Sequence, residues 1–305
     1  MILLRIRLIT AYITLFLFSI PSLALSANTT NEILIEKELG NIPDLKSSQI
    51  DLLKTLLLIS RHWDPSLKIQ PLQDEITKLV LDVKHNLQDS NDTSSITHAL
   101  RMAIHKNAGY RYTEQVDSRG YPTNNEELFL HGMLKTKRGY CMNLSLLYLI
   151  IGQKLDIPLF GVPLPNHFFV RYDKGKDQIN IEATEMGTSF PDSFYGQRYL
   201  GSSEKDNPYF LKNLNTKQTL GAYFSNIGMV YYQNQKIERA IFYLKLSTKI
   251  NSSSIDAQNN LANIYSELKK YPEAIQHYKI ALKTSPGNIS TLFNLGLVQQ
   301  PDDNF

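Results

Sequence analysis

The chain has 305 residues, of which 42% are hydrophobic and 20% are charged, with one cysteine and a formal net charge of +3. The length suggests about two domains, and the apolar share excludes a wholly disordered, collagen-like or low-complexity chain. A single cysteine excludes an intramolecular disulfide framework and a thiolate-rich zinc site, and the nearly balanced charge excludes an electrostatic binder of nucleic acid.

Residues 1–26 have the pattern of an export signal. Two arginines stand near the start, an apolar run covers residues 8–25, and small residues precede a cleavage point before Ala27. An uncleaved anchor is the alternative, because about 18 residues is the lower limit for spanning a bilayer. We expect cleavage, and therefore an exported protein, periplasmic or secreted, without a membrane span in the mature chain.

A helical lead-in is expected over residues 27–94. Residues 49–59 and residues 72–83 place apolar side chains three to four positions apart, which is typical of amphipathic helices. A third helix is expected at residues 96–105, followed by a loop rich in glycine, tyrosine and asparagine at residues 107–125.

The next segment, residues 95–205, has the pattern of an α+β domain. An apolar helix is expected at residues 142–155, and short β-type runs follow it. The expected strands are residues 159–162, 167–172 and 178–182. A helix followed by antiparallel strands is an α+β arrangement. Residues 190–215 look irregular, and residues 206–220 are expected to be a linker.

The C-terminal part repeats with a period of 34 residues. The motif at residues 226–231 recurs at residues 260–265 and again at residues 294–298. This period, with small residues where paired helices touch, is typical of the tetratricopeptide repeat (TPR), an all-α solenoid. The expected units are residues 221–254, residues 255–288 and a partial unit at residues 289–305. We expect their surface to bind protein or peptide ligands.

Cys141 is the residue most suited to chemistry. It follows Lys-Arg-Gly-Tyr at residues 137–140 and opens the apolar helix. A thiol at a helix N-terminus beside basic residues is stabilised as the thiolate, the nucleophilic form. Gly139 would allow a sharp turn and a close approach of the backbone. A structural cysteine that acts as a small hydrophobe is the alternative.

A thiolate nucleophile needs a base, and the base needs a partner that orients it. His167 begins a strand, and a two-residue turn at residues 174–175 would place it directly opposite Glu182 in a hairpin. Directly opposed residues have Cβ atoms about 5 Å apart. A slip of two residues would put Asn180 opposite His167 instead, giving Cys-His-Asn rather than Cys-His-Glu.

The segments at residues 138–149 and residues 159–171 resemble the transglutaminase-like superfamily, and most of all its bacterial SirB-type branch, in which such a domain precedes TPRs. The resemblance implies a papain-like cysteine fold. It assigns Cys141 as the nucleophile, His167 as the base and Glu182 as the third member, at a place where the superfamily usually has Asp.

Acyl transfer on a peptide or amide substrate is the chemistry that follows. The backbone N–H of Cys141 is a candidate oxyanion donor, with Asn124 or Asn125 as a guess for a side-chain donor. Water as acceptor would give a peptidase or amidase, and an amine would give a transamidase. No cofactor and no metal are expected. The competing hypothesis is a non-catalytic TPR scaffold with a degenerate transglutaminase-like domain.

Overall fold

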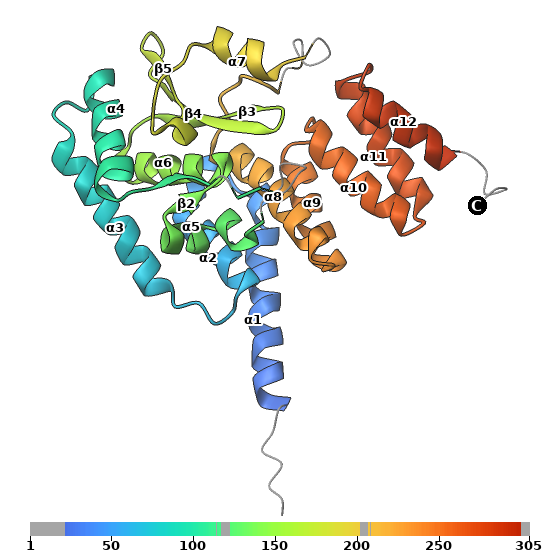
Figure 1. Cartoon of the computed structure of the whole chain (residues 1–305). Coiled ribbons are helices and arrows are strands. Elements are labelled where there is room, and N and C mark those ends of the chain that lie inside the picture. The colour runs from blue at the N-terminus through green and yellow to red at the C-terminus, as the bar shows by residue number, and fades with distance from the viewer. Residues whose placement is uncertain (1–21, 114, 117–122, 202–206, 208, 300–305) are drawn as a thin grey trace, which may run out of the picture.

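The computed structural model describes residues 22–113, 115–116, 123–201, 207 and 209–299 (Figure 1). Most of the expected export signal lies outside these residues. Helix α1, Ser22–Gly40, runs through the expected cleavage point before Ala27. Cleavage there would leave the later turns of α1 on the mature chain, and it stays a prediction. None of the described helices is both long and apolar enough to cross a bilayer.

The N-terminal half is mostly helical, with helices near residues 49–59, 72–83, 96–105 and 142–155 as the apolar spacing predicts, and with a further helix at residues 130–136 where none was expected. Its helices are α1, α2 (Leu52–Trp63), α3 (Ile69–Asn86), α4 (Thr93–Arg101), a π-helix (Met102–Asn107), α5 (Leu130–Thr136) and α6 (Cys141–Leu155). Asp51 begins α2 as its N-cap, since its carboxylate accepts a hydrogen bond from the Lys54 backbone N–H. The apolar face of α2 is buried in the same core as α6, so the lead-in supports the helix that Cys141 opens.

A three-stranded antiparallel sheet follows α6. It contains β3 (Leu159–Leu164), β4 (His167–Asp173) and β5 (Gln178–Ile181), with β4 in the middle. One face of β4 carries Phe168, Val170 and Tyr172, all at most 3% exposed, and this face lies on α6. The expected division of the hairpin into an apolar and a more polar face is therefore confirmed. A separate two-stranded parallel pair joins β1 (Arg111–Tyr112) to β2 (Arg138–Gly139).

The expected hairpin register is wrong by two residues. Asp173 pairs with Gln178 and Arg171 pairs with Asn180, so the loop contains residues 174–177 rather than a two-residue turn. A two-residue type I′ turn needs a positive φ at both central residues, and of residues 174–175 only Gly175 has one. The strand β5 then ends before Glu182, and the alternative slip that would set Asn180 opposite His167 is wrong as well.

The segment expected to be irregular contains a helix. Helix α7, Asp192–Tyr199, lies on the face of the sheet opposite α6 (Figure 1). Tyr195 of α7 joins Val162, Leu164 and Phe169 in a small second core. The apolar side chains of this segment are mostly aromatic and stand among polar residues and a glycine. The sequence pattern alone therefore does not identify this helix, whose buried side is defined by the packing of Tyr195 on the sheet.

The TPRs are helical hairpins, as expected. They contain α8 (Thr216–Gln233), α9 (Ile237–Ile250), α10 (Ile255–Glu267), α11 (Tyr271–Thr284) and α12 (Ile289–Gln299). Gly228 of α8 shows why small residues recur, because a Cβ there would lie 2.7 Å from Leu244 Cγ. Helix α8 starts inside the expected linker, and its Tyr223 hydroxyl donates to the Leu128 carbonyl at 2.9 Å. The repeats thus pack directly against the α+β domain.

Candidate functional site

Cys141 is the first residue of α6 and is partly buried. The preceding turn is fixed by Asn143, whose Oδ1 accepts from the Tyr140 backbone N–H at 2.8 Å and whose Nδ2 donates to the Glu127 carbonyl. Gly139 is required for space rather than for an unusual φ, because a Cβ there would lie 2.9 Å from Met133 Sδ. The thiol therefore sits at the positive end of the helix dipole on a rigidly held turn.

His167 and Glu182 are in contact despite the corrected register. The Nε2 atom of His167 lies 2.8 Å from Glu182 Oε2, and the two side chains are 8% and 4% exposed. A shift of two residues keeps each side chain on its face, and diagonal neighbours across strands remain within reach of long side chains. The pairing therefore depends on the face that the two residues share and not on direct opposition.

Glu182 is held in place by the turn that it begins. It is the N-cap of a 3-10 turn at Ala183–Glu185. Its Oε1 accepts from the Thr184 backbone N–H at 3.1 Å and from the Thr184 hydroxyl at 2.6 Å, which leaves Oε2 for His167. The two Thr184 bonds curl the glutamate side chain back on its own turn, so its extra methylene does not prevent contact with the imidazole.

The pKa of His167 depends on its contacts with both Cys141 and Glu182. Burial lowers the pKa of His167, but hydrogen bonds to the Cys141 and Glu182 side chains and their negative charge outweigh burial and raise the pKa to about 9. For Glu182, burial raises the pKa, and the bonds from His167 and Thr184 hold it below its usual value. Since Glu182 occupies Nε2, the ring nitrogen left for Cys141 is Nδ1. The three side chains form a row, with the imidazole in the middle.

An aromatic cover lies over this row, and the sequence did not predict it. Tyr199 of α7 stacks on the His167 ring with centroids 4.4 Å apart and planes 3° from parallel. One turn earlier, Tyr195 stacks on Phe169 at 3.9 Å and 8°. The i, i+4 spacing of Tyr195 and Tyr199 was the available signal.

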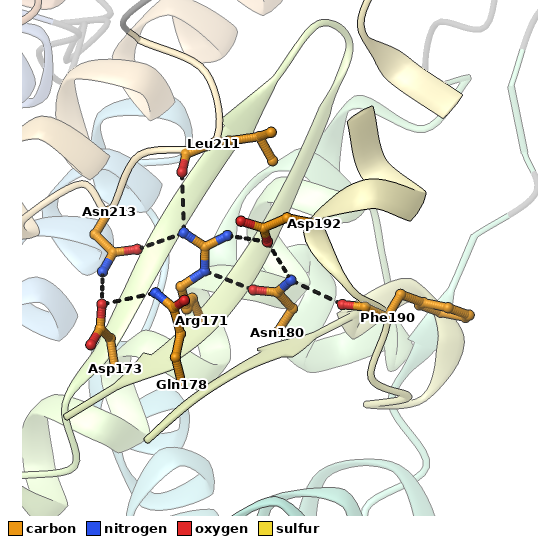
Figure 2. A network of polar contacts seen from close by, with 8 residues as sticks. All are labelled: Arg171, Asp173, Gln178, Asn180, Phe190, Asp192, Leu211 and Asn213. Carbon is orange, nitrogen blue, oxygen red and sulfur yellow. Dashed lines mark hydrogen bonds and ion pairs between the residues drawn. The ribbon is translucent and has the colours of Figure 1, made fainter. Parts of the chain in front are cut away.

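The expected alternative third member, Asn180, belongs to a different network (Figure 2). Its Oδ1 accepts from Arg171 Nε at 2.7 Å, and its Nδ2 donates to the Phe190 carbonyl at 2.9 Å and to Asp192 Oδ1 at 2.7 Å. Arg171 is only 4% exposed, and its guanidinium also donates to the Leu211 carbonyl at 3.1 Å. With both ends of its amide occupied here, Asn180 does not serve His167.

Of the two side chains suggested as oxyanion donors, Asn124 has a structural role as a helix cap. Asn124 Oδ1 accepts from the Glu126 backbone N–H at 3.1 Å and so caps the short 3-10 helix Asn125–Leu128. Oxyanion binding by Asn124 or Asn125 stays a prediction. Within the described part of the chain, no group of three or more histidine, cysteine or acidic side chains is arranged to hold a metal ion.

Comparison with family models identifies both parts of the chain. Residues 70–221 match the model of the transglutaminase-like superfamily, and residues 222–254 and 255–288 each match a tetratricopeptide repeat. The chain therefore contains a transglutaminase-like domain followed by two TPRs, in a mixed helical and sheet fold.

Similar proteins give weaker likenesses. F-box only protein 21 from Mus musculus is 33% identical over 55 residues, and the human protein of that name is 34% identical over 55 residues; each match covers 18% of this chain and 9% of the relative. The fold is similar to that of menin, whose crystal structure reveals the binding site for the Mixed Lineage Leukemia (MLL) protein. That likeness has a TM-score of 0.51 and 12% identity and covers 85% of this chain and 65% of menin. The chain thus spans only a small part of the first relatives and less than two thirds of menin.

Proposed function

We propose that this chain is a cysteine-dependent acyl-transfer protein in which Cys141 is the nucleophile, His167 the general base and acid, and Glu182 the residue that orients His167. The observation that carries the proposal is the row formed by these side chains at the start of α6, with His167 Nε2 2.8 Å from Glu182. A nucleophile, a base and an orienting acid in this order are the arrangement that acyl transfer requires.

The chemistry starts from a protonated His167. Since the pKa of His167 is raised to about 9, the imidazolium form prevails at neutral pH, and a cation beside the sulfur favours the thiolate. The sulfur would attack the carbonyl carbon of an amide, and the C–N bond would break as His167 Nδ1 donates its proton to the departing amine. Glu182 accepts the Nε2–H throughout and so fixes the tautomer.

The resulting thioester on Cys141 has two possible acceptors. Water would give a peptidase or amidase and an amine would give a transamidase, with neutral His167 removing the proton of the acceptor in either case. The oxyanion of each tetrahedral intermediate would be stabilised by the backbone N–H of Cys141 at the helix N-terminus. The substrate we propose is a peptide or amide, and the TPRs would bind a protein or peptide partner.

Acylation of Cys141 tests the proposal directly. The chain is treated with p-nitrophenyl acetate, and acyl adducts are detected by intact-mass spectrometry. Because Cys141 is the sole cysteine, it is the one thiol on which a thioester can form. We expect a transient adduct that is absent in Cys141→Ala and accumulates in His167→Gln only at high pH. Adding glycinamide then compares transfer to an amine with hydrolysis. A folded wild-type chain that forms no adduct would contradict the proposed acyl-transfer activity and favour the hypothesis of a non-catalytic TPR scaffold.

Export from the cell is a second part of the proposal, together with membership in the bacterial SirB-type branch. Export is supported by the basic start, the apolar run and the small residues of residues 1–26. N-terminal sequencing of the full chain expressed in a bacterial host should find Ala27 as the first residue in the periplasmic fraction. Recovery of an uncleaved chain from the cytoplasm would contradict export.

A further inference from the structure

Helix α7 covers His167 with one ring. Tyr199 lies parallel to the imidazole within 3°, at a centroid distance of 4.4 Å, while Tyr195 lies at 6.3 Å and 21°. Such close parallel overlap places the electron-rich face of the phenol against an imidazole that is doubly protonated, and so positively charged, at neutral pH. The contact is therefore specific to Tyr199 and stronger for the protonated form of His167.

Glu182 alone does not fix the imidazole. It holds one atom of the ring, Nε2, through a single hydrogen bond. A ring held at one atom can still tilt about that bond, and tilting would move Nδ1 away from the sulfur of Cys141. A second ring stacked flat on the imidazole opposes this tilt, because the overlap is lost when the planes separate.

The position of α7 is set by a buried cation. Asp192, the first residue of α7, accepts from Arg171 through Oδ1 at 2.5 Å, and the same oxygen accepts from Asn180 Nδ2 at 2.7 Å (Figure 2). The segments on both sides of α7 are also attached, since Phe190 accepts from Asn180 and Leu211 accepts from Arg171. The start of the helix is thereby tied to β4 and β5, the strands that lead to His167 and Glu182.

We propose that Tyr199 is a positioning residue that keeps the imidazole of His167 aimed at Cys141, and that the Arg171–Asp192 pair sets Tyr199 in place by fixing α7. Arg171 is 4% exposed, so its charge is compensated by protein groups, and Asp192 is the carboxylate that it contacts. The inference rests on the proposed function, since a correctly aimed base matters only if Cys141 is activated.

The experiment compares four variants of the full chain. Tyr199→Phe keeps the stacked ring, Tyr199→Leu fills the space without a ring, and Asp192→Asn keeps the acceptor oxygen without the charge. Tyr232→Ala is the matched control for loss of a tyrosine, since Tyr232 lies on α8 and bonds to Glu267. The readouts are the rate of Cys141 alkylation by iodoacetamide across pH and the 15N shifts of the His167 ring, with circular dichroism to verify folding.

We expect Tyr199→Leu to slow alkylation at about pH 6 by about tenfold and to leave the rate at about pH 10 within about twofold, since the thiolate then forms without help. Tyr199→Phe and Tyr232→Ala should match the wild type, and Asp192→Asn should show a smaller loss, about threefold. A folded Tyr199→Leu with the wild-type profile would overturn the proposal, as would an equal loss in Tyr199→Phe.

The 15N shifts separate this inference from the proposed function. If the wild type shows neither acylation nor rapid alkylation near pH 6, the proposed function fails. Tyr199→Leu should still change the Nδ1 and Nε2 shifts of His167, while Tyr199→Phe should leave them unchanged. Unchanged shifts in both variants would refute the positioning role whatever the fate of the acyl-transfer proposal.

Discussion

Replacing Glu182 by glutamine is the sharpest test of the site. Glutamine has the same length, and its carbonyl oxygen can keep the two bonds that Thr184 donates to Glu182 Oε1. Its amide nitrogen then faces His167 Nε2 in place of Oε2. An amide N–H can only donate there, so Nε2 must be the unprotonated nitrogen and the proton moves to Nδ1, beside Cys141. Neutral His167 then has no free nitrogen to accept the thiol proton.

The magnitude follows from the pKa of His167. The difference between the usual 6.5 and about 9 in the fold, at about 1.4 kcal/mol per pKa unit, is about 3.5 kcal/mol in favour of the charged ring. Bonds to Cys141 and Glu182 supply this stabilisation against the opposing effect of burial. If Glu182 supplies about 1.5 kcal/mol of this, its loss lowers the equilibrium constant for proton transfer from the Cys141 thiol to His167 by about tenfold.

The rate of alkylation by iodoacetamide measures the consequence. We expect Glu182→Gln to lower the rate at about pH 6 by at least about tenfold and to approach the wild type above about pH 10. Glu185→Gln is the matched control, because Glu185 is exposed and stands in the same turn. A wild-type pH profile in Glu182→Gln would refute the reasoning, and an equal loss in Glu185→Gln would assign the effect to the turn and not to the carboxylate.

Three further outcomes follow from single contacts. In Cys141→Ala the pKa of His167 should fall from about 9, because burial lowers it and only Glu182 then opposes burial; an NMR titration of the imidazole measures this, and an unchanged value contradicts the contact with sulfur. Gly161→Ala should lower the free energy of unfolding by about 1–3 kcal/mol, since its Cβ would lie 2.3 Å from Phe168 Cζ. Gly196→Ala in α7, where a Cβ meets nothing within 4 Å, should instead raise the free energy of unfolding by about 0.5–1 kcal/mol; chemical denaturation distinguishes the two signs.

The elements that carry the site could be predicted from the sequence, whereas the register could not. The apolar run after Cys141 predicts a helix, and alternation in β4 predicts its buried face, because both patterns are local. The loop of the hairpin depends on the φ angle of Lys174, which no pattern of side chains determines. His167 and Glu182 are in contact although the predicted register is wrong, because a shift of two residues keeps both side chains on the same face of the sheet.

The cover over His167 depends on contacts between distant parts of the chain. Arg171 lies on the more polar face of β4, yet it is buried, and its guanidinium donates to Asp192, Asn213 and the Leu211 carbonyl. These partners follow Arg171 by 21 to 42 positions. Sequence periodicity cannot foresee a buried charge, because its burial is tolerated only after the partners that satisfy it have assembled.

The attachment of the TPRs decides how the enzyme and scaffold hypotheses can be separated. Besides the bond from Tyr223 to Leu128, Arg239 Nη1 donates to the His62 carbonyl at 3.1 Å, and the Tyr243 hydroxyl lies 2.8 Å from His62 Nδ1. Removing the repeats would uncover the buried His62 at the end of α2 and leave the Leu128 and His62 carbonyls without these donors. A truncated chain that lost activity would therefore report unfolding as readily as a lost partner. The distinction has to come from single substitutions in the full chain: if Cys141→Ala retains every ligand and every phenotype of the wild type, the domain acts as a scaffold, and if it retains the ligands but loses the phenotype, the sulfur is used.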